Sequence, residues 1–301
     1  MKAKTVSPLS CMTNGEKVFK VFCYAVLFCL TLVFLLPVWV TFAASFVSEQ
    51  ESIQRGAFIL IPRKFDFSAY KLLLAGGSYV YSAYKITILR TVLGTGISLF
   101  LTVLTAYGIS KTKLPGITAF SGMMFFTMLF GGGLIPFYLI VSALGLRNTI
   151  WALVIPSAIN TWYVFVMRNF FMQLPESLEE AAMIDGAGVL KTLFTIIIPL
   201  SLPSLSTIGL FYAVSQWNSW FDASLYLDDM TMMPVQIILR NIVNRALSMS
   251  DTMVIDDLEY VPPSLAIRST MIVITTLPIL LVYPFLQKYF ISGLTVGAVK
   301  G

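Results

Sequence analysis

The sequence from Leu174 to Thr192 reads LPESLEEAAMIDGAGVLKT, and it is a charged, alanine-rich stretch in an apolar region of the chain. It carries four of the chain's fifteen acidic residues: Glu176, Glu179, Glu180 and Asp185. Long and almost wholly apolar runs precede and follow it. The stretch is therefore a polar connection between hydrophobic segments, and its own pattern has to explain its charge.

The composition of the whole chain indicates an integral membrane protein. Of its 301 residues, 57% are hydrophobic and 12% are charged, whereas soluble globular proteins have a charged fraction of about a quarter. The mean hydropathy is +0.83. The formal net charge of +5 comes from bases that flank apolar runs, where they orient a chain in the bilayer, so nucleic-acid binding is not expected.

Six apolar runs are long enough to cross a membrane as helices, since a span needs about 20 residues for roughly 30 Å of hydrocarbon. They are Val21–Phe46, Ile86–Ser110, Ile117–Ala143, Thr149–Met167, Leu193–Trp217 and Ser269–Gln287. The first run is too long and too far from the N-terminus for a signal peptide, so we expect a retained anchor. The sequence therefore predicts an all-α integral membrane fold with six transmembrane helices.

Lysines in the N-terminal tail and in the short links predict the orientation. The link after the second run contains Lys111 and Lys113, whereas the link after the third run contains only Arg147. The N-terminal tail contributes Lys2, Lys4, Lys17 and Lys20. Both termini are therefore expected in the cytoplasm, and the long loops at about 47–85 and 222–268 are expected outside.

Under this topology the opening stretch is a cytoplasmic loop between the fourth and fifth spans. Pro175 suits the first turn of a helix, and the acidic residues after it favour a helix N-terminus. Gly186 and Gly188 allow a tight turn before a second helix at about Val189. A helix resting on lipid is disfavoured, because such helices are typically rich in lysine and arginine. Its small apolar face consists of Leu178, Ala181, Ala182 and Ile184. We therefore expect a helix that docks on a soluble cytoplasmic protein.

A longer segment, EAAMIDGAGVLKTLFTIIIPLSLP from Glu180 to Pro203, resembles the EAA loop in membrane subunits of ATP-binding-cassette (ABC) importers. That loop has Glu-Ala-Ala, a glycine six residues after the glutamate, and a downstream Ile-x-x-Pro. The tail GLTVGAVKG, from Gly293 to Gly301, is similar to the C-terminus of the maltose-type permease subunit. Four further segments resemble the subfamily that imports complex oligosaccharides: GGGLIPFYLIVSALGLRNT, FYAVSQWNSWFDA, YVPPS and LPILLVYPFLQKYF. The resemblance runs from about Tyr84 to Gly301.

This resemblance implies the type I ABC importer permease fold, with the opening stretch as the coupling helix on a separate ATPase subunit. It makes Glu180 the partner of a basic ATPase residue, Ala181 and Ala182 the close-packing surface, and Gly186 the turn, with Asp185 in the same ATPase-coupling set. In the tail, the residues expected to contact the ATPase are Thr295, Gly297 and Lys300. The implied units are residues 1–83, a permease core at 84–290 with coupling loop 174–192 and outer loop 222–268, and a tail at 291–301.

The same resemblance implies the partners and the location. They are a second permease subunit, a cytoplasmic ATPase dimer that holds ATP and Mg, an extracytoplasmic solute-binding protein, an oligosaccharide and membrane lipid. The chain is expected in the bacterial cytoplasmic membrane.

Signs of catalytic chemistry in this chain itself are missing from the sequence. It contains no histidine and no GxxxxGK[ST] phosphate-binding loop, so neither a metal site nor ATP hydrolysis is expected here. No acidic residue lies within the six runs, which argues against an ion-coupled secondary transporter. The glycines of GGGLIP lie inside the third run, where they favour close helix packing or a local break. We expect no catalytic residue and no cofactor.

A sugar path needs amides and hydroxyls beside aromatic faces. The candidates in the fourth and fifth runs are Asn160, Tyr163, Tyr212, Gln216 and Asn218. Gln216 and Asn218 are about 200° apart on a regular helix, so either the helix loosens near 215–219 or one amide faces the pore, with Gln216 favoured. An interfacial aromatic belt explains Trp217 and Trp220 equally well.

Arg90 is the single charged residue within the runs. We expect its side chain to reach the membrane interface rather than to bind substrate.

The leading hypothesis is therefore the permease subunit of an oligosaccharide importer. Three alternatives stay open: the same importer class with another polar solute, an intramembrane enzyme with its site in the acidic outer loop, and a secondary transporter. Co-purification of an ATPase distinguishes the importer from the enzyme.

Overall fold

The computed structural model describes residues 13–75, 79–248 and 265–298, and no strand occurs among them. The chain divides into two compact units. The first consists of Met1–Lys71 and Glu259–Val273, and the second of Leu72–Leu258 and Ile274–Gly301.

The first unit is built on α1, Asn14–Ala44. A capping box starts this helix: the Thr13 backbone N donates to the Glu16 carboxylate at 2.7 Å, and the Glu16 backbone N donates to the Thr13 hydroxyl at 3.4 Å. The unit also contains α2, Glu49–Arg55, and the start of α3, Ser68–Leu74. Most of the large apolar side chains of α1 are exposed within the chain, as expected for a helix in contact with lipid.

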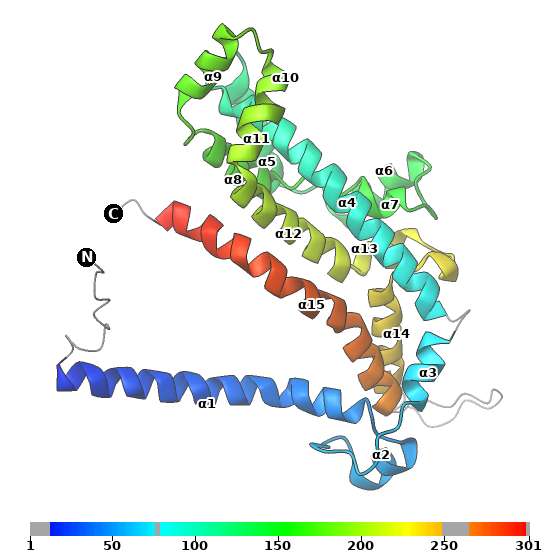
Figure 1. Ribbon diagram of the computed structural model, residues 1–301. Coiled ribbons are helices and arrows are strands. Elements are labelled where there is room, and N and C mark those ends of the chain that lie inside the picture. The colour runs from blue at the N-terminus through cyan, green and yellow to red at the C-terminus, as the bar shows by residue number, and fades with distance from the viewer. Residues whose placement is uncertain (1–12, 76–78, 249–264, 299–301) are drawn as a thin grey trace. The chain divides into compact units, whose positions relative to one another are not determined.

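The second unit is organised around α4, Tyr79–Ser110, which packs against α8, Thr161–Phe171, and α12, Leu202–Asn218 (Figure 1). The buried side of α4 includes the small residues Gly94 and Ser98. Because a Cβ atom on Gly94 would lie 2.6 Å from the Gln216 side chain, α4 and α12 approach closely at this point.

Two apolar segments of this unit are bent rather than straight. The third predicted run is divided into α5, Ile117–Leu129, and α6, Leu134–Ala143, which meet at 114°. Gly133 has a φ of 88°, so the local break predicted from GGGLIP is confirmed.

The second bend, of 85°, separates Val189–Leu200 from α12 at Ser201. The Val189–Leu200 segment consists of α10, Val189–Thr192, the π-helix Leu193–Ile197 and α11, Ile198–Leu200.

The fourth predicted run, Thr149–Met167, is not one continuous helix, which corrects the sequence-based expectation. It contains α7, Trp151–Val154, and most of α8, separated by residues 155–160. Pro156 lacks the backbone donor that a continuing helix needs, and the Asn160 side chain caps α8 by accepting from the Tyr163 backbone N at 3.3 Å. Apolar composition alone does not reveal this break.

The outer loop expected at 222–268 is largely helical where it is described. It contains most of α13, Phe221–Tyr226, the 3₁₀ turn Met230–Met232 and α14, Val235–Ser248. Residues 249–264 of this loop lie outside the described residues.

Three helical segments are long and apolar enough to cross a membrane: α1, α4 and the Leu265–Val282 part of α15, which runs from Leu265 to Ala298. Counting each bent pair as one span raises the number to five within the described ranges. The six-span count stays a prediction.

Candidate functional site

The stretch from Leu174 to Thr192 folds as its sequence predicts. Helix α9, Glu176–Ile184, begins directly after Pro175. Two of its acidic residues lie in the first turn, where negative side chains interact favourably with the positive end of the helix dipole. Gly186 has a φ of 76° and makes the turn, and α10 begins at Val189. The stretch is thus two short helices joined by a glycine turn.

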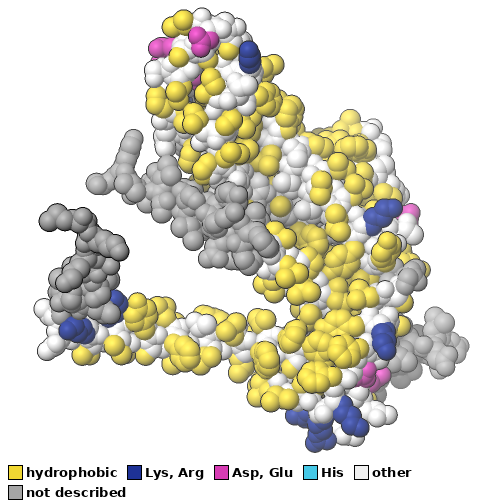
Figure 2. Space-filling model, in the orientation of Figure 1, with side chains coloured by type: hydrophobic (Ala, Val, Ile, Leu, Met, Phe, Trp, Pro, Cys, Tyr) yellow, Lys and Arg dark blue, Asp and Glu magenta, His cyan; other side chains and the backbone are white. Residues whose placement is uncertain are grey.

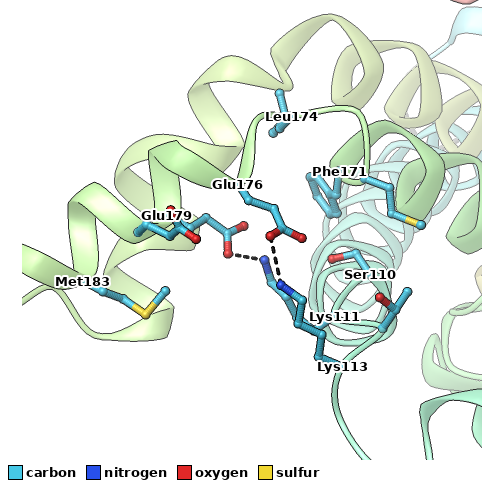
Figure 3. A pocket seen from close by; sticks show the side chains of 11 residues that line it. Ser110, Lys111, Lys113, Phe171, Leu174, Glu176, Glu179 and Met183 are labelled. Atoms are coloured by element: carbon cyan, nitrogen blue, oxygen red, sulfur yellow. Dashed lines mark hydrogen bonds and ion pairs between the residues drawn. The ribbon is translucent and has the colours of Figure 1, made fainter.

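Two ion pairs attach α9 to the link that follows α4. The ammonium group of Lys111 pairs with the Glu179 carboxylate, and Lys113 Nζ lies 3.0 Å from Glu176 Oε2 (Figure 3). Lys111 also lies over the Tyr107 ring, 4.5 Å from its centroid. The hydrogen bond to Glu176 raises the pKa of Lys113 above its ordinary value. These two ion pairs therefore connect α9 to the end of α4, beside an apolar cluster that contains Tyr107 and Leu174.

A cavity of about 260 Å³ lies between this link and α9. Figure 3 shows Lys111 and Lys113 pointing toward the carboxylates of Glu176 and Glu179. The other lining residues are Ser110, Thr112, Phe171, Met172, Leu174, Glu180 and Met183. The mixture of charge and apolar surface suits contact with a protein better than contact with lipid.

The outward surface of the loop combines carboxylates with apolar side chains. Glu180 and Ala181 are exposed, and Glu180 forms no ion pair within the described part of the chain. Ile184 is 86% exposed, and Met183, Val189 and Leu190 are exposed as well. In Figure 2 the acidic side chains gather over α9 and hydrophobic side chains cover much of the flank of the same unit. Exposed apolar side chains beside carboxylates suit contact with another protein surface.

Ala182 does not belong to that outward surface. Its side chain is only 5% exposed and packs inside the chain, because it lies one residue further around α9 than Ala181. The expectation that both alanines face a partner is thus wrong for Ala182 in this structure. Asp185 is exposed at the end of α9.

A second candidate region is a hollow of about 650 Å³ beside α12. It is lined by Tyr163, Leu210, Phe211, Val214, Ser215, Asn218 and Ser219. The rings of Tyr163 and Phe211 stack with their centroids 5.8 Å apart. Aromatic faces beside an amide and hydroxyls are the groups that suit a sugar's apolar face and its hydroxyls.

Of the five residues predicted for a sugar path, two line this hollow: Tyr163 and Asn218. Tyr212 is buried, and its hydroxyl bonds to Thr102 Oγ1 at 2.8 Å and accepts from the Asn160 backbone N at 3.1 Å. Asn160 is exposed and caps α8. The structure therefore places Tyr163 and Asn218 at the hollow, whereas Tyr212 lies in the packed interior and Asn160 serves as a helix cap.

Gln216 lies on the packed side of α12 and not on the hollow. Its side chain is 4% exposed, and its amide N donates to Ser157 Oγ at 3.4 Å. Helix α12 remains helical through Asn218, so the two amides point in different directions, and it is Asn218 that faces the hollow. The preference for Gln216 over Asn218 is not supported by this geometry.

Arg90 does not reach an interface, which corrects the sequence-based expectation. Its side chain is 1% exposed, and its guanidinium pairs with the Asp222 carboxylate and donates to Gln216 Oε1 at 2.9 Å. A charged residue within an apolar run requires a partner, so the sequence did indicate that Arg90 would be paired. Nothing in the sequence identified the partner, which lies 132 positions away.

A helical membrane chain with a hollow beside a bent helix and a charged surface loop has the architecture of a transporter's membrane subunit. The chain matches no protein-family model. It is 41% identical to the polygalacturonan/rhamnogalacturonan transport system permease protein YtcP of Bacillus subtilis, covering 95% of this chain and 99% of that protein. It is 31% identical to the trehalose/maltose transport system permease protein MalG of Thermococcus litoralis, covering 80% and 84%.

A solved structure agrees with these relatives. The crystal structure of a bacterial ABC transporter involved in the import of the acidic polysaccharide alginate contains a chain that matches with a TM-score of 0.82 and 32% identity. The match covers 93% of this chain and 99% of that chain. The chain belongs to the family of carbohydrate ABC transporter permeases.

The predicted ATPase-contacting tail lies largely outside the described residues. Helix α15 includes the backbone of Thr295 and Gly297, but the Thr295 side chain and all of Lys300 lie outside the described residues. Their role stays a prediction.

Proposed function

We propose that the chain is one of two membrane subunits of an ATP-driven importer that moves an oligosaccharide into a bacterial cell. The observation that carries this proposal is the 41% identity, over nearly the full length of both chains, to a permease of a sugar-polymer transport system. The chain forms part of the translocation path through six spans, with both termini in the cytoplasm and the 222–268 loop outside.

The stretch from Leu174 to Thr192 is the coupling loop in this proposal. A separate ATPase dimer holds ATP and Mg, and its surface receives Glu180, Ala181 and the exposed apolar residues of α9 and α10. The absence of a phosphate-binding loop motif from the sequence supports a separate ATPase. The tail at 291–301 contacts the same ATPase, and an extracytoplasmic binding protein delivers the sugar.

The hollow beside α12 is this chain's part of the sugar path. Its volume of about 650 Å³ accommodates one or two sugar rings by the usual size of small-molecule sites, and its lining offers an aromatic face and polar groups. The partner permease contributes the opposite wall. An oligosaccharide is favoured over another polar solute because the relatives' names specify sugars and sugar polymers.

Asn218→Leu tests this assignment. The substitution replaces the amide with an apolar group of similar size, and loss of one hydrogen bond to substrate should lower transport about tenfold. Basal ATP hydrolysis should not change. Uptake of trigalacturonate and of maltotriose is measured with the complete importer in proteoliposomes.

Asn169→Leu is the matched control, because Asn169 is exposed on α8 and does not line the hollow. Equal uptake by both variants and the wild type would place the sugar path elsewhere. If the wild-type importer takes up neither trigalacturonate nor maltotriose, that result counts against an oligosaccharide substrate.

A further inference from the structure

We propose that Arg90 is a positioning residue for transport: it fixes the junction between α12 and α13 and thereby holds Asn218 and Ser219 at the hollow. The inference rests on the proposed role of the hollow as part of the sugar path. It assigns a transport role to a buried ion pair that lies behind the hollow rather than in it.

The contacts of Arg90 are all with two segments that flank one junction. Nε donates to Gln216 Oε1 at 2.9 Å, and Nη1 donates to the Ser219 backbone carbonyl at 3.2 Å and to Asp222 Oδ1 at 3.2 Å. Nη2 pairs with Asp222 Oδ2. The guanidinium on α4 thus binds the last turn of α12, the residue after it, and the first turn of α13.

These contacts satisfy groups that the two helix ends leave open. Helix α12 ends at Asn218, and beyond it the carbonyl of Ser219 accepts from Arg90. A cation at a helix C-terminus and a carboxylate in a first helical turn are both favoured by the helix dipoles. Asp222 also accepts from Ser219 Oγ at 2.9 Å and from the Ala223 backbone N at 2.9 Å. The ion pair therefore fixes where α12 stops and where α13 starts.

Arg90 acts through these residues rather than by touching a sugar. Its side chain is 1% exposed, and each of its three nitrogens already donates to a protein oxygen. On the other side of the junction, Asn218 and Ser219 line the hollow. Loss of the ion pair should consequently move the lining of the hollow without removing any group from it.

Charge compensation alone is a competing explanation for the pair. Removing one partner of a buried ion pair leaves an uncompensated charge, whereas replacing both partners with neutral groups is often tolerated. The double variant Arg90→Gln/Asp222→Asn separates the two explanations, because it has no orphan charge and yet lacks the bidentate contact.

We expect the double variant to assemble normally and to keep its basal ATP hydrolysis. The apparent KM for the better carried of trigalacturonate and maltotriose should rise about tenfold, with kcat within about twofold of the wild type. In the same background, Asn218→Cys should react with a membrane-impermeant maleimide at a rate changed at least about threefold, once the native cysteines are replaced by serine.

The matched control is Arg147→Gln/Asp228→Asn. This pair has the same residue types at 2.8 Å but is exposed, so its loss should leave KM and the labelling rate unchanged. Arg90→Lys provides a second test if the double variant fails to assemble. Lysine keeps the charge but cannot reproduce the bidentate contact with Asp222 from a planar group, so Arg90→Lys should also raise the KM.

A wild-type KM and an unchanged labelling rate in the double variant, or in Arg90→Lys, would overturn the proposal and leave the pair as charge compensation. If those variants are normal while Asn218→Leu is impaired, only the positioning role is wrong. If Asn218→Leu is also normal, both the positioning role and the assignment of the hollow are wrong.

Discussion

Glu180→Lys is expected to abolish sugar uptake while the chain still inserts into the membrane. Glu180 is exposed on α9 and has no ion pair in the described residues, so its carboxylate is available to a basic group of the ATPase. A charge-assisted contact contributes about 1.5–3 kcal/mol, or roughly 10- to 150-fold in binding. Lysine removes that contact and adds repulsion between like charges, so the expected loss of binding to the ATPase is at the upper end of this range.

The measurement is ATP-driven uptake by reconstituted importer, together with the amount of ATPase that co-purifies with the permease. Glu49→Lys is the matched control, because Glu49 is an exposed acidic residue at the start of a different short helix, α2. Normal uptake by Glu180→Lys with its ATPase present would contradict the coupling role. Loss of uptake in both variants would point to a general effect of charge reversal.

The two short helices and the glycine turn of residues 174–192 could be predicted from the sequence because their signals are local. Pro175 and the acidic residues mark a helix start, and Gly186 marks the turn, all within twelve positions. The break at GGGLIP was predictable for the same reason, since glycine permits the backbone conformation that Gly133 adopts.

The break in the fourth run also has a local signal, Pro156, but hydropathy measures only the apolar character of Thr149–Met167, so the run looked continuous. Features that depend on tertiary contacts could not be predicted from local signals. The direction of Gln216 depends on which side of α12 packs on α4, and the partner of Arg90 lies in α13, 132 positions away. The family resemblance supplied the function, but these contacts required the structure.

The second large effect is expected at the ion pair between Lys111 and Glu179. Lys111 follows α4 directly, and Glu179 lies in the first turn of α9, so the pair joins the helix that packs on α12 to the proposed coupling helix. The two side chains are 33% and 19% exposed, which limits screening by solvent. Movement of α9 by the ATPase should therefore reach α4 through this contact.

Lys111→Glu and Glu179→Lys should each lower uptake about tenfold while ATP hydrolysis continues, because each places like charges together at the joint. The double variant, which restores opposite charges in reversed order, should recover at least about half of the wild-type uptake, since coupling energies of contacting residues are non-additive.

The same three variants at Lys113 and Glu176 are the control. That pair is exposed and separated by 3.0 Å, and exposed pairs contribute little, so all three should transport normally. Uptake that stays low in the Lys111/Glu179 double variant would mean that each residue acts separately, and α9 would then have to transmit its movement through the apolar contacts of Phe171 and Leu174 instead.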